Sequence, residues 1–362
     1  MQSPRDTIRP HFLDGLNDMV VAVVIPSYRV KDHILSVIQR IGPRVTTIYV
    51  VDDCCPQKSG AHVQQKCTDE RVRVIFNAKN QGVGGATIVG YKQALMDGAE
   101  IVVKIDGDGQ MDPALIPAFI KPIEQGIADY TKGNRFFSLE NLEGMPPLRM
   151  FGNAALSFVS KVSSGYWNVM DPTNGYTAIH SAALSSLSLH KIDKGYFFES
   201  DMLFRLNTIR AVVHEVPMKA VYGDEKSSLS IPKVLKQFPK RYLSRLFKRL
   251  GYNYFLRDFN ACSVEILAGF GMLVFGVIYG AFHWYHAAIS HTNTPTGTIM
   301  LAVLPIILGV QMLLEAVTLD IMNVPQVPLQ NLMLDGVSRK NSTPANTDQV
   351  AFGDRARDVA HQ

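Results

Sequence analysis

Two long apolar stretches lie close together near the C-terminal end of the sequence. Ile266–Phe282 contains no charged residue, and Ile299–Met322 is interrupted only by Glu315 and Asp320. A helix needs roughly 20 apolar residues to cross a bilayer, and each stretch is close to that length. The connection between them, Ala287–Thr298, is polar and contains no lysine or arginine. We therefore predict a transmembrane hairpin, with a pair of buried core helices as the alternative.

The segment just before this hairpin is basic and amphipathic. Apolar and basic residues recur there at spacings of three and four, which places them on different faces of a helix. The basic residues are Lys233, Lys236, Lys240, Arg241, Arg245, Lys248, Arg249 and Arg257. The pattern predicts a helix in a membrane interface, although an ordinary solvated helix has the same periodicity. Because the basic residues lie on one side of the hairpin, we expect both hairpin ends in the cytoplasm.

Three acidic residues lie at or within the predicted spans: Glu265, Glu315 and Asp320. Acidic side chains inside a membrane are costly and are functional candidates. All three lie toward the ends that we expect to be cytoplasmic, where hydration is easy. We therefore expect a structural role for them, with hairpin packing or a contact between subunits as the alternative.

The first two thirds of the chain alternate short apolar runs with helical patterns. The expected strands are Val20–Ile25 (followed by Pro26), Thr46–Val51, Val72–Phe76 and Ile101–Ile105, and the expected helices are Asp32–Arg40 and Val83–Met96. Continuous apolar strands that alternate with helices predict βαβ units and a parallel sheet. Polar residues that follow such strands lie where open α/β sheets bind ligands.

Composition excludes several other classes. The 362 residues are 47% hydrophobic, which supports a sizeable core, and a formal net charge of +4 says little about partners by itself. We expect no nucleic-acid partner. The four cysteines (Cys54, Cys55, Cys67 and Cys262) form no CxxC pair, which argues against a zinc site and a disulfide framework. The first thirty residues lack the order of a secretory signal, so we expect no cleaved leader.

Three polar motifs follow the expected strands. Asp106-Gly107-Asp108-Gly109-Gln110 places two carboxylates among glycines directly after an apolar strand, which is typical of a Mg²⁺ or Mn²⁺ site that also binds phosphates. Asp52-Asp53 follows the second strand and predicts either a contact to a base or ribose or a simple turn cap. The glycines of Asn80–Ala86 either cradle phosphate at a helix N-terminus or only permit close packing.

In their order these motifs, starting with Val24-Ile25-Pro26-Ser27-Tyr28, resemble the nucleotide-binding half of family 2 glycosyltransferases, which have the A-type (Rossmann-like) fold. Later motifs are more specifically similar to dolichol-phosphate mannose synthase and its bacterial polyprenyl-phosphate relatives. They are Gly133-Asn134-Arg135, Arg149 to Asn153, Asp171–Tyr176, Gly195–Met202 and Tyr222–Ser228. The resemblance covers about residues 20 to 230.

The resemblance implies roles for individual residues, which we state as expectations. Asp106, Asp108 and Gln110 hold the metal, and Arg135, Arg149 and Asn153 bind the acceptor phosphate. Donor-binding residues are Pro26, Tyr28, Asp52, Asp53, Gly85, Asp106, Lys226 and Ser228. Asp108, Arg135, Arg149 and Asp201 are the expected catalytic residues.

The implied reaction is transfer of a hexose from a nucleotide sugar to a polyprenyl (undecaprenyl or dolichyl) phosphate, with inversion, at the cytoplasmic membrane face. A phosphate nucleophile is largely ionised at neutral pH and needs positioning rather than a strong base. In that case Asp201 orients the acceptor pocket or the donor sugar. The alternative is a lipid or glycan hydroxyl acceptor, for which Asp201 is the general base.

These expectations divide the chain into four parts. Residues 1–230 form the cytoplasmic catalytic domain, 231–260 basic amphipathic interface helices, and 261–323 the transmembrane hairpin. Residues 324–362 form a cytoplasmic tail that we expect to be disordered, because it is polar and irregular from Leu334 onward. The expected protein is an integral inner (plasma) membrane glycosyltransferase of cell-envelope glycan synthesis, and whether it is a homo-oligomer stays open.

Overall fold

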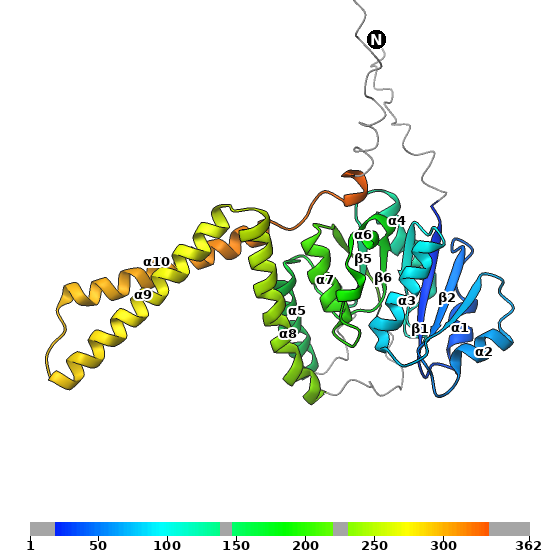
Figure 1. Ribbon diagram of the computed structural model, residues 1–362, viewed down its shortest axis with the longest axis horizontal. Helices are drawn as coiled ribbons and strands as arrows, with labels where there is room; N and C mark the ends of the chain where they lie inside the picture. The colour runs from blue at the N-terminus through cyan, green and yellow to red at the C-terminus, as the bar shows by residue number, and fades with distance from the viewer. Residues whose placement is uncertain (1–18, 138–146, 220–230, 333–362) are drawn as a thin grey trace, which may run out of the picture.

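The computed structural model describes residues 19–137, 147–219 and 231–332. Its centre is a seven-stranded sheet in the order β3-β2-β1-β4-β6-β5-β7 (Figure 1). The strands are β1 (Val21–Ser27), β2 (Thr47–Asp52), β3 (Val72–Phe76), β4 (Ile101–Lys104), β5 (Tyr130–Asn134), β6 (Thr177–His180) and β7 (Val213–Pro217). The first four strands are mutually parallel as predicted, whereas β6 runs antiparallel to both β4 and β5.

Helices cover both faces of this sheet and bury its apolar strands. The helices of this α/β domain are α1 (Ile34–Gln39), α2 (Ser59–Lys66), α3 (Gly82–Met96), η1 (Pro113–Leu115), α4 (Ile116–Glu124), α5 (Pro147–Ser164), α6 (Ser181–Ser186), η3 (Leu189–Lys191) and α7 (Phe198–Thr208). One core lies between the sheet and α3, α6 and α7, and the other lies between the sheet and α1, α2 and α4. The predicted fold class, an A-type (Rossmann-like) α/β domain followed by C-terminal helices, is confirmed.

Strand β1 runs two residues further than its sequence pattern indicated. Pro26 lies inside β1 rather than ending it, and it pairs in register with Val51 of β2. Proline cannot donate a ladder hydrogen bond and is tolerated where pairing on one side is missing. The pairing of β1 with β4 ends at Val24, so Pro26 lies beyond it. The extension carries Ser27 and the residues after it to the end of the sheet where the polar motifs gather.

The basic segment forms one long helix, α8 (Ile231–Gly251), followed by a π-helical turn, η4 (Tyr252–Arg257). Three of its arginines, spaced four residues apart, do not face outward but form ion pairs with acidic residues. The pairs are Arg241 with Asp193, Arg245 with Asp201 and Arg249 with Asp320. Leu243 and Phe247 remain more than half exposed on the outer side, beside the exposed Lys240 and Lys248. The expected interface surface therefore consists of apolar residues and lysines, because the arginines bind within the protein.

Two long helices, α9 (Ala261–Ser290) and α10 (Thr296–Met322), form a hairpin that projects away from the α/β domain (Figure 1). Both are long and apolar enough to cross a membrane, with mean hydropathies of 2.1 and 2.2, and most of their side chains are exposed rather than buried. The helices approach closely at small residues. A Cβ at Gly269 would lie 3.0 Å from the carbonyl oxygen of Gly309, and one at Gly276 would lie 2.7 Å from that of Ala302. Small residues at such crossings are typical of helices packed in lipid.

The chain returns to the α/β domain after the hairpin. The backbone N–H groups of Leu329 and Gln330 donate to the buried carboxylate of Asp129, at 3.0 and 3.3 Å. The Gln330 side chain donates to two further carbonyl oxygens, those of Ile123 and Ala128. The prediction of a disordered tail is therefore wrong for residues 324–332. The sequence pattern did not indicate these contacts, because the partners lie about 200 positions away in the chain. The rest of the tail lies outside the described residues.

Candidate active site

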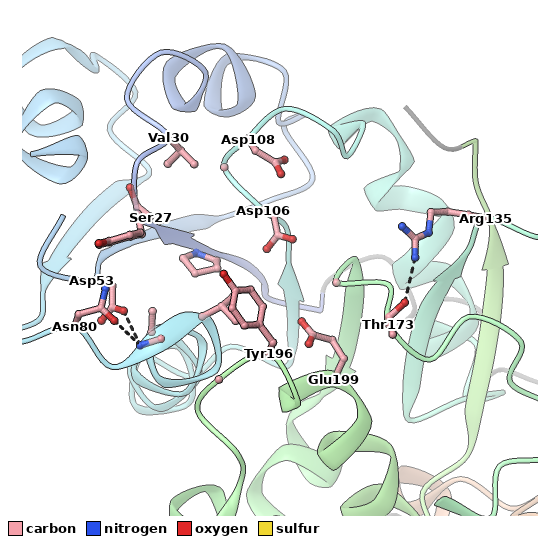
Figure 2. Close-up of a pocket in the computed structure, with 18 of the residues that line it drawn as sticks. Ser27, Val30, Asp53, Asn80, Asp106, Asp108, Arg135, Thr173, Tyr196 and Glu199 are labelled. Carbon is pink, nitrogen blue, oxygen red and sulfur yellow. Dashed lines mark hydrogen bonds between the residues drawn. The ribbon is translucent and has the colours of Figure 1, made fainter. Parts of the chain in front are cut away.

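A pocket of about 680 Å³ opens at the carboxyl ends of β1 and β4. Asp53 and Asn80 lie on one side, Arg135 and Thr173 lie on the other, and the loop that carries Asp106 and Asp108 lies between them (Figure 2). Pro26, Tyr28 and Asn153 also line the pocket. The polar motifs that sequence analysis selected from separate strands therefore meet in one place, as expected for an open α/β sheet.

The loop after β4 presents two carboxylates to this pocket. Asp108 accepts a hydrogen bond from the backbone N–H of Gln110 at 3.0 Å, and Gly109 has a φ of +82°, which glycine adopts without strain. Gly175 faces the same loop from the neighbouring segment. A Cβ there would lie 2.8 Å from Oδ2 of Asp106 and 2.6 Å from Nζ of Lys104. A glycine at this position therefore keeps the space beside the Asp106 carboxylate open.

A buried lysine lies beneath these carboxylates. Lys104 is 1% exposed, and its Nζ lies 2.9 Å from Oδ1 of Asp106 and 3.3 Å from Oε1 of Glu199. Burial favours the neutral amine, but the charges of the two carboxylates outweigh this effect and raise the pKa of Lys104 above its ordinary value. Lys104 is therefore the fixed positive charge that holds Asp106 and Glu199 side by side.

The second buried lysine, Lys132 on β5, differs from Lys104. Its Nζ donates to the carbonyl oxygen of Asn174, and burial lowers its pKa to about 8. Glu199 and Asp171 counteract this fall only in part. Because a pKa of about 8 still lies above neutral pH, Lys132 remains mostly protonated there, and both buried lysines carry positive charge.

Glu199 is a pocket residue that sequence analysis missed. It lies in the first turn of α7, extends toward Asp106 in Figure 2, and is 12% exposed. Sequence analysis selected Asp201, two positions later in the chain, as the catalytic residue of this motif. The available signal was Lys104, a charge inside the apolar run Val102–Ile105, because a buried lysine requires an acidic partner.

Arg135 lies on the opposite side of the pocket and is held by a bidentate ion pair. Its Nε and Nη2 donate to the Asp171 carboxylate at 2.7 and 2.9 Å, and Nη2 also lies 3.3 Å from the Thr173 hydroxyl. Burial raises the pKa of the Asp171 carboxyl, but hydrogen bonds and charge from Arg135 outweigh it and leave that pKa below its ordinary value. The guanidinium plane is thereby fixed while it lines the pocket.

Asp53 organises the glycine-rich turn at the start of α3. Its carboxylate accepts hydrogen bonds from the backbone N–H groups of Gln81 and Gly82 at 2.8 to 3.0 Å, and from the Asn77 side chain at 2.8 Å. The Asp53 carboxylate therefore occupies the N–H groups at this helix N-terminus, which argues against a phosphate bound there. The glycines permit close packing, since a Cβ at Gly82 would lie 2.5 Å from the Lys194 carbonyl oxygen.

Two of the predicted acidic site residues are buried away from the pocket. Asp52 is 3% exposed and accepts hydrogen bonds from the backbone N–H groups of Cys55 and Gly60, so it closes the turn after β2. Asp201 has no exposed surface and forms ion pairs with Arg205 and Arg245 at 3.0 and 2.6 Å. It joins α7 to α8. This position argues against Asp201 as a general base, because a base must reach the acceptor proton.

The other predicted residues divide into three groups. Gln110 and Gly85 do not line the pocket, and a Cβ at Gly85 would lie 2.4 Å from the Gln81 side chain. Arg149 falls in the first turn of α5, four positions before Asn153, but its side chain is outside the described part of the structure. Lys226 and Ser228 also lie outside the described residues.

The pocket residues suit a divalent cation that is bound jointly by protein carboxylates and by phosphate groups of the substrate. Among the described residues, no group of three or more histidine, cysteine, aspartate or glutamate side chains is arranged to bind a metal alone. Mg²⁺ and similar ions are commonly bound by one or two carboxylates together with substrate phosphates. Asp106 and Asp108 supply such a pair at the pocket wall, and Gly175 leaves space next to them.

Comparison with known proteins agrees with this geometry. The model of "Glycosyl transferase family 2" matches residues 22–188. A UDP-N-acetylglucosamine–dolichyl-phosphate N-acetylglucosaminyltransferase of Methanococcus voltae is 30% identical over 221 residues, which are 57% of this chain and 88% of the relative. The chain belongs to glycosyl transferase family 2. Like other members of this family, it is a glycosyltransferase.

Two further similarities complete the comparison. An undecaprenyl-phosphate mannosyltransferase of Micrococcus luteus is 29% identical to this glycosyltransferase over 217 residues, which are 58% of this chain and 88% of the relative. Among solved structures, glucosyl-3-phosphoglycerate synthase from Mycobacterium tuberculosis, in complex with Mn²⁺, UDP and its product, has a TM-score of 0.47 and 18% identity. It covers 69% of this chain and 86% of that one.

Proposed function

We propose that this glycosyltransferase moves a hexose, with inversion, from a nucleotide sugar to a polyprenyl (undecaprenyl or dolichyl) phosphate at the cytoplasmic face of the membrane. The observation that carries the proposal is the order of charges across one pocket. Asp53 lies at one end, Asp106 and Asp108 lie in the middle, and Arg135 lies at the other end. The relatives named for transfer to dolichyl and undecaprenyl phosphates support the same acceptor class.

This order assigns each end of the pocket to one substrate. The nucleoside binds near Asp53 and Tyr28, and the donor diphosphate lies beside Asp106 and Asp108. A bound Mg²⁺ or Mn²⁺ would stabilise the negative charge that develops on the leaving diphosphate. Glu199, next to Asp106, is placed to accept hydrogen bonds from hydroxyl groups of the transferred sugar.

The acceptor end requires a cation rather than a base. A phosphate monoester is largely ionised at neutral pH, so its oxygen attacks the anomeric carbon without prior loss of a proton. Guanidinium groups bind phosphate bidentately and offset its repulsion from the donor diphosphate. Arg135 lines this end, and Arg149 lies on the helix whose Asn153 also lines the pocket. The buried, doubly paired Asp201 favours this acceptor over a hydroxyl group.

The C-terminal helices are consistent with a lipid acceptor. A polyprenyl phosphate keeps its chain in the bilayer and its phosphate at headgroup level. The hairpin α9–α10 anchors the chain in the membrane, and the exposed Leu243, Phe247 and Leu256 would enter the interface beside it. Exposed lysines on the same helix would be attracted to anionic headgroups, by about 1 kcal/mol for each residue close to the surface.

The test is a donor screen with the purified full-length protein, a polyprenyl phosphate and Mg²⁺ or Mn²⁺. We expect transfer from one class of nucleotide sugar, loss of transfer on chelation by EDTA, and a product whose sugar is joined to phosphate with inverted anomeric configuration. Transfer that survives chelation would contradict the metal assignment. Transfer only to hydroxyl acceptors, or to no acceptor with any donor, would contradict the proposed function.

We expect Arg149→Ala to weaken use of the acceptor far more than binding of the donor. Loss of one charged phosphate contact should lower kcat/KM for the polyprenyl phosphate by roughly 10- to 100-fold. The KM for the nucleotide sugar should stay close to the wild-type value. Lys161→Ala, on the same helix but outside the pocket, is the matched control. An equal loss for donor and acceptor would show that Arg149 does not serve the acceptor phosphate.

A further inference from the structure

Asp320, in the last turns of α10, takes part in a buried polar network. The residue is 7% exposed, and its two carboxylate oxygens accept four hydrogen bonds from three different parts of the chain. The donors are Nη1 and Nη2 of Arg249 at 2.6 and 3.0 Å, the Tyr254 hydroxyl at 2.5 Å and Nε1 of Trp167 at 2.8 Å. These contacts agree with the structural role expected for this acid, and its partners lie in α8, in η4 and in the turn after α5.

Arg249 connects this carboxylate to the end of α5. The side chain is 2% exposed, and besides the Asp320 pair it donates from Nη2 to the Val162 carbonyl oxygen at 2.8 Å and from Nε to that of Ser163 at 3.2 Å. Carbonyl groups in the last turn of a helix have no partner within the helix, and a cation there also interacts favourably with the helix dipole. Arg249 therefore caps α5 while it binds α10.

Gly165 provides the space for this arrangement. It follows the last residue of α5 with a φ of +78°, the left-handed conformation in which glycine commonly ends a helix. A Cβ at this position would lie 2.7 Å from Nη1 of Arg249 and 2.9 Å from the Asn207 amide nitrogen. The end of α5 is thus shaped around the buried guanidinium.

A second contact beside the network ties the same end of α10 to the α/β domain. Arg210 donates from Nη1 to the Asn323 carbonyl oxygen at 2.7 Å and to its side-chain oxygen at 2.9 Å. The Asn323 amide nitrogen in turn donates to the Tyr254 hydroxyl at 3.2 Å. The end of the second membrane helix is therefore held in a defined orientation rather than connected through a flexible segment.

Helix α5 links this joint to the active site. Asn153 and Leu156 of this helix line the pocket, and its C-terminal end is capped by Arg249. We propose that the Asp320–Arg249 pair is a positioning joint that fixes the acceptor end of the pocket relative to the membrane helices. The inference rests on the proposed function, because the height of the pocket above the membrane matters only if the acceptor is held in the bilayer.

Ionic bonding suits this role better than apolar packing would. A buried ion pair is costly to desolvate and often adds little stability over well-packed apolar residues. Its contribution is a directional geometry, here with donors from α8, from η4 and from the turn after α5. Asp320 and Arg249 are positioning residues and touch no reacting atom.

The test compares two acceptors in the full-length protein reconstituted in lipid nanodiscs. One is a long polyprenyl phosphate held in the bilayer, and the other is a short, water-soluble polyprenyl phosphate. For Asp320→Asn we expect kcat/KM for the long acceptor to fall by roughly 10- to 100-fold, since displacement of substrate by about 1 Å can cost about 10²-fold. The short acceptor and the donor KM should stay near their wild-type values. Glu315→Gln, an exposed acid on the same helix, is the matched control.

Each outcome decides the inference. Equal losses for both acceptors in Asp320→Asn protein that thermal unfolding shows to be folded would overturn it, and so would unchanged activity with both acceptors. Trp167→Phe removes a single hydrogen bond to Asp320 and should give a smaller loss, again selective for the long acceptor, even if Asp320→Asn folds poorly. If the wild-type protein transfers sugar to neither acceptor, the proposed function itself fails and the joint inference falls with it.

Discussion

Asp108→Asn is expected to remove sugar transfer while leaving the protein folded. The substitution keeps the side-chain oxygen that accepts the Gln110 N–H hydrogen bond, so the loop after β4 should hold its shape. It removes half of the carboxylate pair that faces the donor diphosphate. Because a bound cation supplies several kcal/mol of charge stabilisation, we expect kcat to fall by at least about 10³-fold.

The matched control for this variant is Asp112→Asn, four positions later in the same segment. Asp112 is exposed, does not line the pocket and caps the 3₁₀ turn η1, a role that asparagine fills equally well. Activity should be assayed with Mg²⁺ and Mn²⁺ at several concentrations, and folding checked by thermal unfolding. If Asp108→Asn turned over like Asp112→Asn, the assignment of the metal to this loop would be wrong.

Lys104→Met is expected to have the largest effect on stability. It removes the buried charge between Asp106 and Glu199 and leaves two neighbouring carboxylates without their cation. Removing one partner of a buried ionic network costs about 3 to 5 kcal/mol. The free energy of unfolding, measured by urea titration of the detergent-solubilised protein, should fall by that amount. Because the pKa of Lys104 is raised on folding, its contribution is fully present below about pH 10.4, the ordinary lysine value, and is lost as the pH rises through the raised value.

Two further variants make this second prediction specific. Lys92→Met changes the same residue type at an exposed position of α3 and should cost little. The double variant Lys104→Met/Glu199→Gln removes one of the two repelling charges and should regain part of the lost stability. If Lys104→Met were as stable as Lys92→Met, or if the double variant were no better than the single one, Lys104 would not be the cation of this cluster.

Local sequence was sufficient for the first four strands of the α/β domain and for its helices α1 and α3. The runs at Val72–Phe76 and Ile101–Ile105 became β3 and β4 within one residue, and the pattern at Val83–Met96 became α3. Such segments are recognised from their own apolar pattern, which depends little on the rest of the chain. The reversed direction of β6 was not predicted, because strand direction depends on which neighbours a strand finds and not on its own residues.

The same division applies to the site. Asp106, Asp108, Asp53 and Arg135 were selected from motifs that follow strands, and the structure gathers them around one pocket. The choice between Glu199 and Asp201 required tertiary structure. Both lie in the first turn of α7, but a helix turns by about 100° per residue, so one points toward Lys104 and the other toward α8.

What the sequence determined by itself was the class of protein: an α/β catalytic domain with an acidic loop after a buried strand, followed by two helices long enough to cross a membrane. What only the tertiary structure decided was the partner of each buried charge. The sequence pattern predicted that the arginines of α8 face the membrane. In the structure they form ion pairs with Asp193, Asp201 and Asp320. The physical reason is that periodicity indicates which face of a helix is polar but not what packs against that face. The acidic partners lie up to about 70 positions away in the chain, and only folding brings them close.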